Sequence, residues 1–471
     1  MKYDYEDLYA AKKTYGQDIN TSLGNAADPI DADQKLQEDA LMSYVASVNY
    51  SYDDKYYASF SFRRDGSSRL SPDTRWGNFW SLSASWRLSQ ERFMQPLKSV
   101  LSDLKLRASY GVNGNLPSSY YGYQSTYTTG AFYSGKPSPW ESTLGNEELT
   151  WEKNYALNLG LDIGLFSRVN VSLDWYTRTT KDLLMSKQLN SISGFSSLLT
   201  NVGQMRNTGV ELEVRSNNIK TKDFSWTTAF NLSHNKNKIL KLADLPWFVD
   251  GRYVRKEGYP FNTIYLREYA GVDPETGSAL YYDNQQDENG NYTKNKVTDP
   301  GQASPIPLKD ITPTISGGFM NTFNYKFIDL SFNLSYSFGG YSYDNASYIL
   351  QDDGYSVISN KSTEQRRRWQ KPGDITDVPR FVYGNKKGGN YNSSRAIHST
   401  DHIRLKSLIL GLNAPKAWLQ KLGIGNARIY FSGTNLLTWA AYDQYDPEMS
   451  GVVGFYTPPL KTYAFGLELK F

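Results

Sequence analysis

Apolar and polar residues alternate along most of this chain with a period of two. In the segment WSLSASWRL, Trp80, Leu82 and Trp86 fall on one side, whereas the other side carries serines and Arg87. The segments YALNLGLDI and IDLSFNLSYSF repeat this alternation further along the chain. Successive side chains of a β-strand point to opposite faces, so this period is typical of strands with one apolar face. The pattern predicts an all-β protein.

The alternating segments predict about fifteen strands, and many have the ~9 to 11 residues with which a tilted strand crosses a bilayer. Helical periodicity is confined to short stretches near 93–101 and 414–422. Residues 1–40 are expected to form a loop segment before the first strand. The expected strands are 41–52, 55–64, 77–88, 103–112, 150–164, 168–178, 207–216, 224–234, 262–272, 278–283, 315–325, 328–338, 403–412, 427–437 and 462–471.

Short and long connections alternate between these strands. Consecutive antiparallel strands would therefore place the short turns at one end of the sheet and the long loops at the other, which is the pattern of an outer-membrane barrel. The short or medium connections are 53–54, 89–102, 166–168, 217–223, 273–277, 326–327 and 413–426. The long ones are 65–76, 113–149, 179–206, 235–261, 284–314, 339–402 and 438–461.

A soluble β-sandwich also alternates along each strand, so the period alone leaves two architectures open. The polar sides of these strands are rich in Ser, Asn, Gly and Thr, which suits a wet lumen, and the apolar sides carry Tyr, Trp and Phe near the strand ends. A midplane Arg or Lys on a lipid-facing side would cost about 2 to 4 kcal/mol, and the clearest strands place none there. These features favour an antiparallel transmembrane β-barrel.

Composition excludes several other classes of protein. The 471 residues contain no cysteine, which removes disulfide scaffolds and thiolate sites. The formal net charge of +3 is spread along the chain, so nucleic acid is not an expected partner. No apolar run approaches the ~20 residues of a transmembrane helix. The amino terminus also lacks the apolar core of a secretory signal.

Several segments resemble, in the same order and over residues 41–471, signatures of the SusC/RagA family of TonB-dependent outer-membrane transporters. They are FRRDGSSRLSPDTRWGNFWSLSASWRLSQERFM (62–94), LKLRASYGVNGN (104–115), GNEELTWEKN (145–154), NVGQMRNTGVELEV (201–214), GVDPETGSALYYD (271–283), RWQKPGDITDVPR (368–380), IRLKSLILGLNAPKAWLQKLGI (403–424), FSGTNLLTWAAYDQYDPE (431–448) and YTPPLKTYAFGLELKF (456–471).

The resemblance implies a fold and a function. Such proteins form a barrel of roughly 22 strands around a plug. They import glycans or peptides across the outer membrane of Gram-negative bacteria, with energy from the TonB complex and with a SusD-like lipoprotein over the extracellular mouth. With about fifteen strands, this chain is expected to hold the carboxy-terminal barrel portion (41–471) without the plug, as a truncated or split chain. A passive porin, a surface-binding barrel and a barrel enzyme remain alternatives.

The last strand is expected to place its apolar residues against lipid. Its side chains also resemble the recognition signal of the barrel-assembly machinery, whereas an ordinary edge strand of a soluble sheet is the alternative. The residues concerned are Tyr463, Phe465, Leu467, Leu469 and Phe471.

Ligand binding is expected from aromatic residues in the long loops, because sugar rings present flat C–H faces that stack on Trp and Tyr. Packing between loops is the alternative for each of them. The candidates are Tyr120, Tyr121, Tyr123, Trp140, Trp247 and Tyr391, with Tyr127 and Tyr442 also in loops.

No catalytic residue, cofactor or metal site is expected. His398 and His402 have a spacing that binds metal on a helix, but they lead from a loop into a strand. The segment DQYDPE (443–448), with Asp443, Asp446 and Glu448, could bind a cation, but a proline-centred turn is the better default interpretation.

Overall fold

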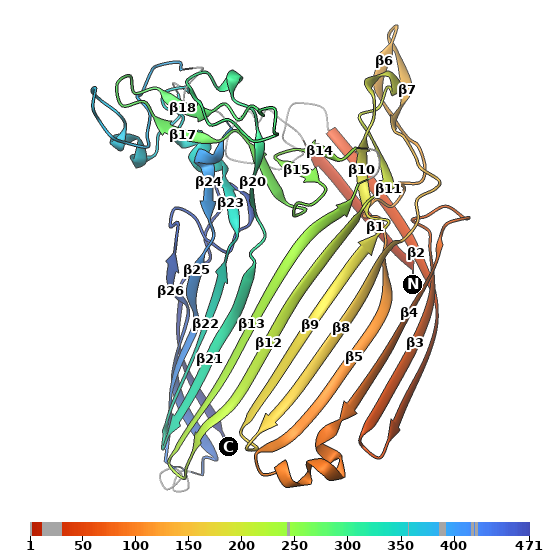
Figure 1. Ribbon diagram of the computed structural model, residues 1–471, viewed down its shortest axis with the longest axis vertical. Coiled ribbons are helices and arrows are strands. Elements are labelled where there is room, and N and C mark those ends of the chain that lie inside the picture. The colour runs from red at the N-terminus through yellow and green to blue at the C-terminus, as the bar shows by residue number, and fades with distance from the viewer. Residues whose placement is uncertain are drawn as a thin grey trace. The chain divides into compact units, whose positions relative to one another are not determined.

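The computed structural model describes residues 2–11, 31–242, 245–356, 358–385, 392–415, 419 and 423–471. Its main element is a sheet of 14 strands in sequence order (Figure 1). Neighbouring strands of this sheet, such as β2 and β3 or β21 and β22, run antiparallel. The strands are β1 (Lys2–Ala11), β2 (Asp31–Tyr52), β3 (Tyr56–Ser67), β4 (Trp76–Arg87), β5 (Leu101–Asn115), β8 (Glu152–Leu165), β9 (Val169–Lys181), β12 (Gln204–Lys220), β13 (Phe224–Lys241), β21 (Ile315–Tyr325), β22 (Ile328–Phe338), β25 (His402–Asn413), β26 (Asn426–Ala440) and β28 (Thr462–Lys470).

The all-β prediction is confirmed, and the sheet contains every expected strand except 262–272 and 278–283. The bounds of β21 and β22 agree with the prediction to the residue. The expected helical stretch near 93–101 contains the 3-10 helix Arg92–Leu97, whereas the stretch near 414–422 lies largely outside the described residues. Within the described ranges, no helix is long and apolar enough to cross a membrane.

The strands expected at 262–272 and 278–283 are wrong as members of the main sheet. The first divides into β16 (Thr263–Leu266) and β17 (Tyr269–Val272), and the second is β18 (Ala279–Tyr282). Strand β16 belongs to a small loop sheet with β14 (Trp247–Asp250), β15 (Tyr253–Lys256) and β20 (Ile306–Asp310). Strands β17 and β18 form another with β19 (Lys296–Val297). Their apolar side chains are buried within the loops. The apolar residues of these segments therefore form a core between loops and do not face lipid. Residues 242–314 therefore form one long connection.

The expectation of a loop over residues 1–40 is also wrong in part. Strand β1 pairs with the first ten residues of β2, from Lys2 opposite Ala40 to Ala11 opposite Asp31. Most residues of this stretch are polar, and Asp7 interrupts the short alternation of Tyr3, Tyr5 and Tyr9 with charged residues. A ladder of backbone hydrogen bonds does not require apolar side chains, which is why the pattern did not predict these residues as strands.

Other secondary structure lies in the connections. A short α-helix is α1 (Asn345–Leu350), and 3-10 turns occupy Leu88–Gln90, Arg92–Leu97, Ser191–Ser193, Pro300–Gln302, Thr363–Arg367 and Ser394–Ala396. The loop strands are β6 (Thr126–Tyr133), β7 (Lys136–Thr143), β10 (Leu184–Gln188), β11 (Ser197–Asn201), β14 (Trp247–Asp250), β15 (Tyr253–Lys256), β19 (Lys296–Val297), β20 (Ile306–Asp310), β23 (Tyr341–Asp344), β24 (Ile397–Ser399) and β27 (Gly451–Val453).

The alternation of short and long connections holds in the structure. The turns β12–β13 and β21–β22 lie at one end of their strands, and the long loops leave the other end (Figure 1). The turn β2–β3 is short because Asp53 and Asp54 both adopt positive φ, 51° and 49°. Two successive residues of this kind match the twist of the flanking strands in a tight hairpin.

The apolar faces of the sheet strands are exposed and not packed into a core. The side chains of Phe465, Leu467 and Leu469 on β28 are 82%, 62% and 46% exposed, and Tyr463 and Phe471 are also exposed. A β-sandwich would bury such a face against a second sheet. Exposed, regularly alternating apolar side chains are the surface that a strand presents to hydrocarbon.

Aromatic side chains gather on this apolar face near the short turn 221–223. The rings of Phe224 and Tyr325 lie 6.5 Å apart, and those of Trp226 and Phe323 lie 5.5 Å apart. The indole Nε1 of Trp226 donates to the Asn321 side-chain oxygen at 2.8 Å. Amphipathic aromatic rings concentrate at the level of lipid headgroups, so these residues indicate where the membrane interface lies.

Charged residues on the opposite face are paired with one another. Arg107 on β5 binds Asp162 on β8 at 2.8 Å and Asp174 on β9 at 3.0 Å. Arg428 on β26 binds Asp329 on β22 at 2.6 Å. These charged side chains of the inward face therefore form ion pairs, as charged groups in a protein interior generally do.

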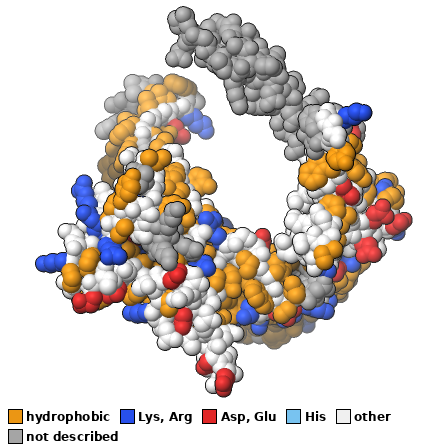
Figure 2. Space-filling view, turned by 90° about the horizontal axis from the view of Figure 1, so that it is seen from above, with side chains coloured by type: hydrophobic (Ala, Val, Ile, Leu, Met, Phe, Trp, Pro, Cys, Tyr) orange, Lys and Arg blue, Asp and Glu red, His pale blue; other side chains and the backbone are white. Residues whose placement is uncertain are grey.

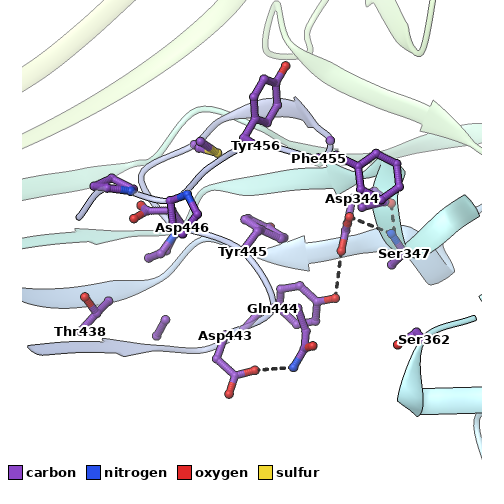
Figure 3. A pocket seen from close by; sticks show the side chains of 18 of the residues that line it. Asp344, Ser347, Ser362, Thr438, Asp443, Gln444, Tyr445, Asp446, Phe455 and Tyr456 are labelled. Carbon is purple, nitrogen blue, oxygen red and sulfur yellow. Dashed lines mark hydrogen bonds between the residues drawn. The ribbon is translucent and has the colours of Figure 1, made fainter. Parts of the chain in front are cut away.

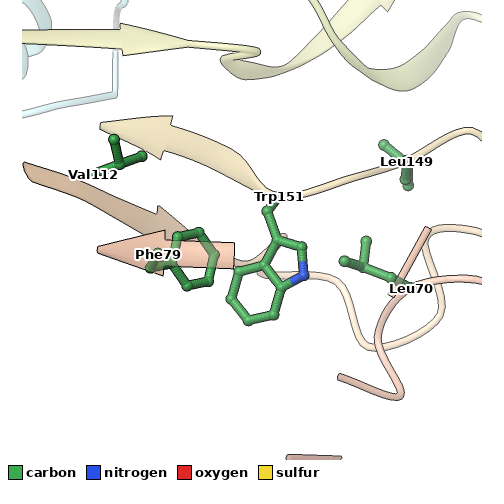
Figure 4. Packing of buried hydrophobic residues seen from close by; sticks show 5 residues of the cluster. All are labelled: Leu70, Phe79, Val112, Leu149 and Trp151. Atoms are coloured by element: carbon green, nitrogen blue, oxygen red, sulfur yellow. The ribbon is translucent and has the colours of Figure 1, made fainter. Parts of the chain in front are cut away.

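The chain divides into two compact units, each with hydrophobic clusters of its own. In the first unit, residues 1–84, 108–157 and 178–204, the buried side chains of Leu70, Phe79, Val112, Leu149 and Trp151 form one cluster (Figure 4). The rings of Phe79 and Trp151 meet edge to face with centroids 5.1 Å apart. These residues come from three of the segments that resemble the SusC/RagA family, so those segments encode the packing of the strand ends.

In the second unit, residues 85–107, 158–177 and 205–471, the connections 242–314 and 339–401 pack together. Ile264, Leu266, Tyr343 and Ala396 form a buried cluster. The Trp369 indole donates to the Pro274 carbonyl at 2.8 Å, which joins GVDPETG to RWQKPGD. Two more family-like segments thus contact each other.

Gly317 provides a test of the close approach between strands. A Cβ atom at this position would lie 2.1 Å from the Asn231 carbonyl oxygen and 2.4 Å from the Tyr336 hydroxyl, whereas at Gly318 the nearest atom lies at 3.4 Å. We expect Gly317→Ala to lower the free energy of unfolding by about 1 to 3 kcal/mol, since overpacking displaces backbone. Urea unfolding in lipid vesicles measures the change. The neighbouring Gly318→Ala is the control, and equal effects of the two substitutions would contradict the assignment.

Candidate ligand-binding cavity in the loops

A cavity of ≈ 750 Å³ lies where the connection 339–401 meets the connection 441–461 (Figure 3). Its walls come from Asp344 and the following helix α1, from the loop ends of β25 and β26, and from residues 442–461. Strand β23 pairs with β24 and with β27, so one small sheet ties the two connections together. On the loop side of the molecule, hydrophobic side chains lie next to charged ones (Figure 2).

One wall of the cavity is aromatic and fixed by hydrogen bonds. The Tyr442 hydroxyl donates to Asp344 Oδ2 at 3.0 Å, and the Tyr445 hydroxyl bonds to the Ser342 hydroxyl. The ring of His398 lies flat against Tyr442, with centroids 3.7 Å apart and an angle of 3° between the planes. Burial raises the pKa of Tyr442, so the phenol remains a neutral donor.

Asp344 joins this wall to helix α1. Its Oδ1 atom accepts a hydrogen bond from the Ser347 amide at 2.9 Å, as the N-cap of the helix. Both oxygens of the carboxylate are therefore used, one by the helix and one by Tyr442 (Figure 3). A buried carboxylate that accepts two such bonds is satisfied without a counter-ion.

The base of the cavity is a charge network centred on Arg404. This side chain is buried, and it binds Asp446 at 2.7 Å and Glu448 at 3.2 Å. Lys406 binds Glu448 at 2.6 Å. Arg404 and Lys406 are two positions apart on β25, a spacing that places side chains on one face of a strand, and the register of β25 shifts at Lys406 against both of its neighbours. An extra residue in a strand re-aims the side chains around it.

The network shows that DQYDPE is a turn held by cations of the protein. Asp446 Oδ1 accepts from the Glu448 amide at 2.9 Å, and the Met449 amide donates to the Asp446 carbonyl at 3.0 Å. Among the described residues, no group of three or more potential ligands is arranged to hold a metal ion. His398 and His402 likewise have separate surroundings, since His402 contacts the Thr400 carbonyl and Glu448.

The described aromatic residues that were predicted to bind ligand have different local surroundings. Tyr120 and Tyr121 lie 6.3 Å apart, with Tyr120 under the Arg69 guanidinium, and Tyr123 packs against the Trp151 cluster. Trp140 is exposed on the β6–β7 hairpin. In the other unit, Trp247 lies 5.9 Å from Tyr265. Tyr391 lies outside the described residues. Their role in binding stays a prediction.

The cavity contains residues that the sequence did not single out. Tyr442 was expected as a loop aromatic, whereas Gln444, Tyr445, Phe455 and Tyr456 were not named as ligand-binding residues. The sequence feature that could have indicated them is the concentration of aromatic, acidic and proline residues in the segments DQYDPE and GFYTPP. Their proximity to Asp344 depends on a contact between residues 98 positions apart.

Comparison with known proteins agrees with this architecture. The family model described as TonB dependent receptor-like, beta-barrel, matches residues 2–293. The chain belongs to this family. As a TonB-dependent receptor barrel, it is a protein of the outer membrane, and its exposed apolar strand faces contact lipid.

Individual relatives confirm the resemblance to SusC and RagA. The chain is 33% identical to TonB-dependent receptor P3 of Formosa agariphila, over 93% of this chain and 46% of that protein. It is 31% identical to TonB-dependent receptor SusC of Bacteroides thetaiotaomicron, over 93% and 45%. The structure of the RagAB peptide transporter matches all of this chain and 52% of that chain, with 30% identity and a TM-score of 0.88. The chain therefore spans about half the length of these relatives.

The stacked His398 gives the cavity wall a dependence on pH. Burial lowers the pKa of His398 below its usual 6.5, and Asp344 only partly opposes this effect. Because the unfolded chain binds the proton more tightly, stability from this residue is complete above pH 6.5 and is lost as the pH falls below that value. We expect hydrogen exchange of β23 and β24 to accelerate on acidification, after correction for intrinsic rates.

His398→Phe is the matched control for this prediction. It keeps a ring against Tyr442 but removes the titrating group, so the additional pH dependence should disappear. If wild type and variant showed the same pH profile, His398 would not be the sensitive group.

Proposed function

We propose that this chain forms barrel wall and extracellular loops of a transporter that actively imports nutrients across the outer membrane. The similarity to the RagAB peptide transporter over the whole chain carries the proposal. Membership of the TonB-dependent receptor family and the loop cavity support it. The cargo would be a glycan or a peptide.

The proposed partners follow from the same relationship. The TonB complex would supply energy through a plug region of the complete transporter, and a SusD-like lipoprotein would cover the extracellular loops. Transport needs no covalent step. The compensated charges on the inward strand faces support a wet passage rather than a reaction centre.

An uptake assay tests active import. Cells that express the complete transporter containing this chain receive labelled neutral oligosaccharides or a random peptide library, with and without a protonophore. We expect accumulation that the protonophore abolishes, because TonB draws on the inner-membrane proton gradient. Cells lacking the gene are the control. Uptake that persists unchanged with the protonophore would contradict active import and favour a passive porin.

We also propose that the apolar face of β28 is recognised by the barrel-assembly machinery. Phe471 is exposed beside this face. Phe471→Ser should lower the folded, heat-modifiable fraction in outer membranes severalfold, because it removes an apolar contact that precedes insertion. The adjacent Lys470→Ser is the matched control. Normal assembly of the Phe471 variant would remove this residue from the proposed signal.

A further inference from the structure

We propose that the loop cavity is a cargo subsite and that it binds a neutral sugar ring. The inference rests on the import function proposed above, and it adds the site and the chemical class of ligand. The residues that would contact the sugar are Asp443, Gln444, Phe455 and Tyr456, all of which line the cavity.

The size and rigidity of the cavity suit a small ligand. Its ≈ 750 Å³ falls within the roughly 300 to 1,000 Å³ of typical ligand sites. Tyr442 and Tyr445 cannot rotate freely, because their hydroxyls are bonded to Asp344 and Ser342. A wall that is already ordered loses little conformational entropy when a ligand binds.

The charge of the cavity favours a neutral ligand. The carboxylates of Asp344 and Asp446 are occupied by Tyr442 and Arg404, respectively. The cavity lining also includes Asp443 and Lys461, which have opposite charges and no ion pair among the described residues. The lining therefore presents no excess of positive charge with which to attract an anionic glycan or an acidic peptide.

The exposed edge of the cavity offers the two contacts that a sugar ring requires. Phe455 and Tyr456 are 67% and 62% exposed, so flat aromatic surface is available next to the cavity. Asp443 Oδ1 accepts from the Gln444 amide at 2.8 Å, which places an acceptor and an amide group side by side (Figure 3). Adjacent sugar hydroxyls both donate and accept hydrogen bonds, and ring C–H faces can stack on the aromatic side chains.

Calorimetric titration of the complete transporter in detergent tests this site. The probes are short neutral oligosaccharides of glucose, mannose or xylose, and, separately, a random peptide library. We expect a neutral oligosaccharide to bind, with affinity about tenfold weaker in Tyr456→Ala, which loses the stacking surface. Asp443→Asn should weaken binding by about tenfold as well, since it removes a charged acceptor.

Two further variants control for structural damage. Tyr456→Phe keeps the ring and should bind within about twofold of wild type, since stacking uses the ring face. Tyr383→Ala removes an exposed tyrosine of the other connection, 339–401, that does not line the cavity, and should leave affinity unchanged. Heat-modifiable migration identifies variants that have not folded. Among the folded variants, a weaker affinity of Tyr456→Ala than of Tyr456→Phe then shows that the aromatic ring at position 456 contacts the ligand.

The outcomes separate this inference from the proposed function. Oligosaccharide binding that is unaffected by Tyr456→Ala and Asp443→Asn, or no binding by any probe, would overturn the cavity as a subsite even if import were active. Peptide binding that these variants weaken would overturn the sugar as ligand. Uptake that the protonophore does not affect, with cavity-dependent sugar binding intact, would instead reject active import and leave the site in place.

Discussion

Hydrocarbon offers no hydrogen bonds to the backbone, and this constraint shapes the described sheet. Each unpaired amide or carbonyl group costs several kcal/mol in lipid, so strands that cross a membrane must be paired along their length. The β21–β22 pair meets the requirement without interruption, from Ile315 opposite Phe338 to Tyr325 opposite Ile328. With the backbone fixed in this way, each side chain faces either lipid or the polar interior. The alternation of apolar and polar residues with a period of two follows from these two environments.

The constraint weakens at the loop end, and there the chain becomes irregular. The register of β25 shifts near Lys406, against both of its neighbours. Arg404 and Lys406 then bind the segment 446–448, which forms the base of the cavity. Buried ion pairs of this kind contribute little net stability but penalise alternative arrangements. The sheet thereby sets the position of a loop whose own backbone has no regular ladder.

The main sheet could be read from the sequence because its faces differ in polarity. The strands 315–325 and 328–338 carry that difference to their ends, and their bounds were predicted correctly. Strand β1 alternates tyrosine with charged residues over only a few positions, so its backbone pairing identifies it more clearly than its sequence does. Strands β16 to β18 do alternate, but they bury their apolar side chains in a loop core that the pattern cannot distinguish from lipid. Local polarity thus predicts a strand without always identifying what covers it.

The candidate site was less predictable for a different reason. Its wall depends on Tyr442 meeting Asp344, 98 residues earlier in the chain. Aromatic content alone pointed equally to Tyr123, which packs in a hydrophobic cluster, and to Tyr442, which lines the cavity. The sequence supplied the residue types, whereas tertiary contacts decided which of them face open space.

The central claim is that one face of each sheet strand touches lipid and the other faces water. Because the chain has no cysteine, single spin labels can be attached through Leu82→Cys, Ala84→Cys, Ser81→Cys and Ser83→Cys on β4 in outer-membrane vesicles. Labels at 82 and 84 should be relaxed mainly by oxygen, which concentrates in lipid, and labels at 81 and 83 mainly by a water-soluble nickel chelate. Equal access of the chelate to all four positions would contradict the account.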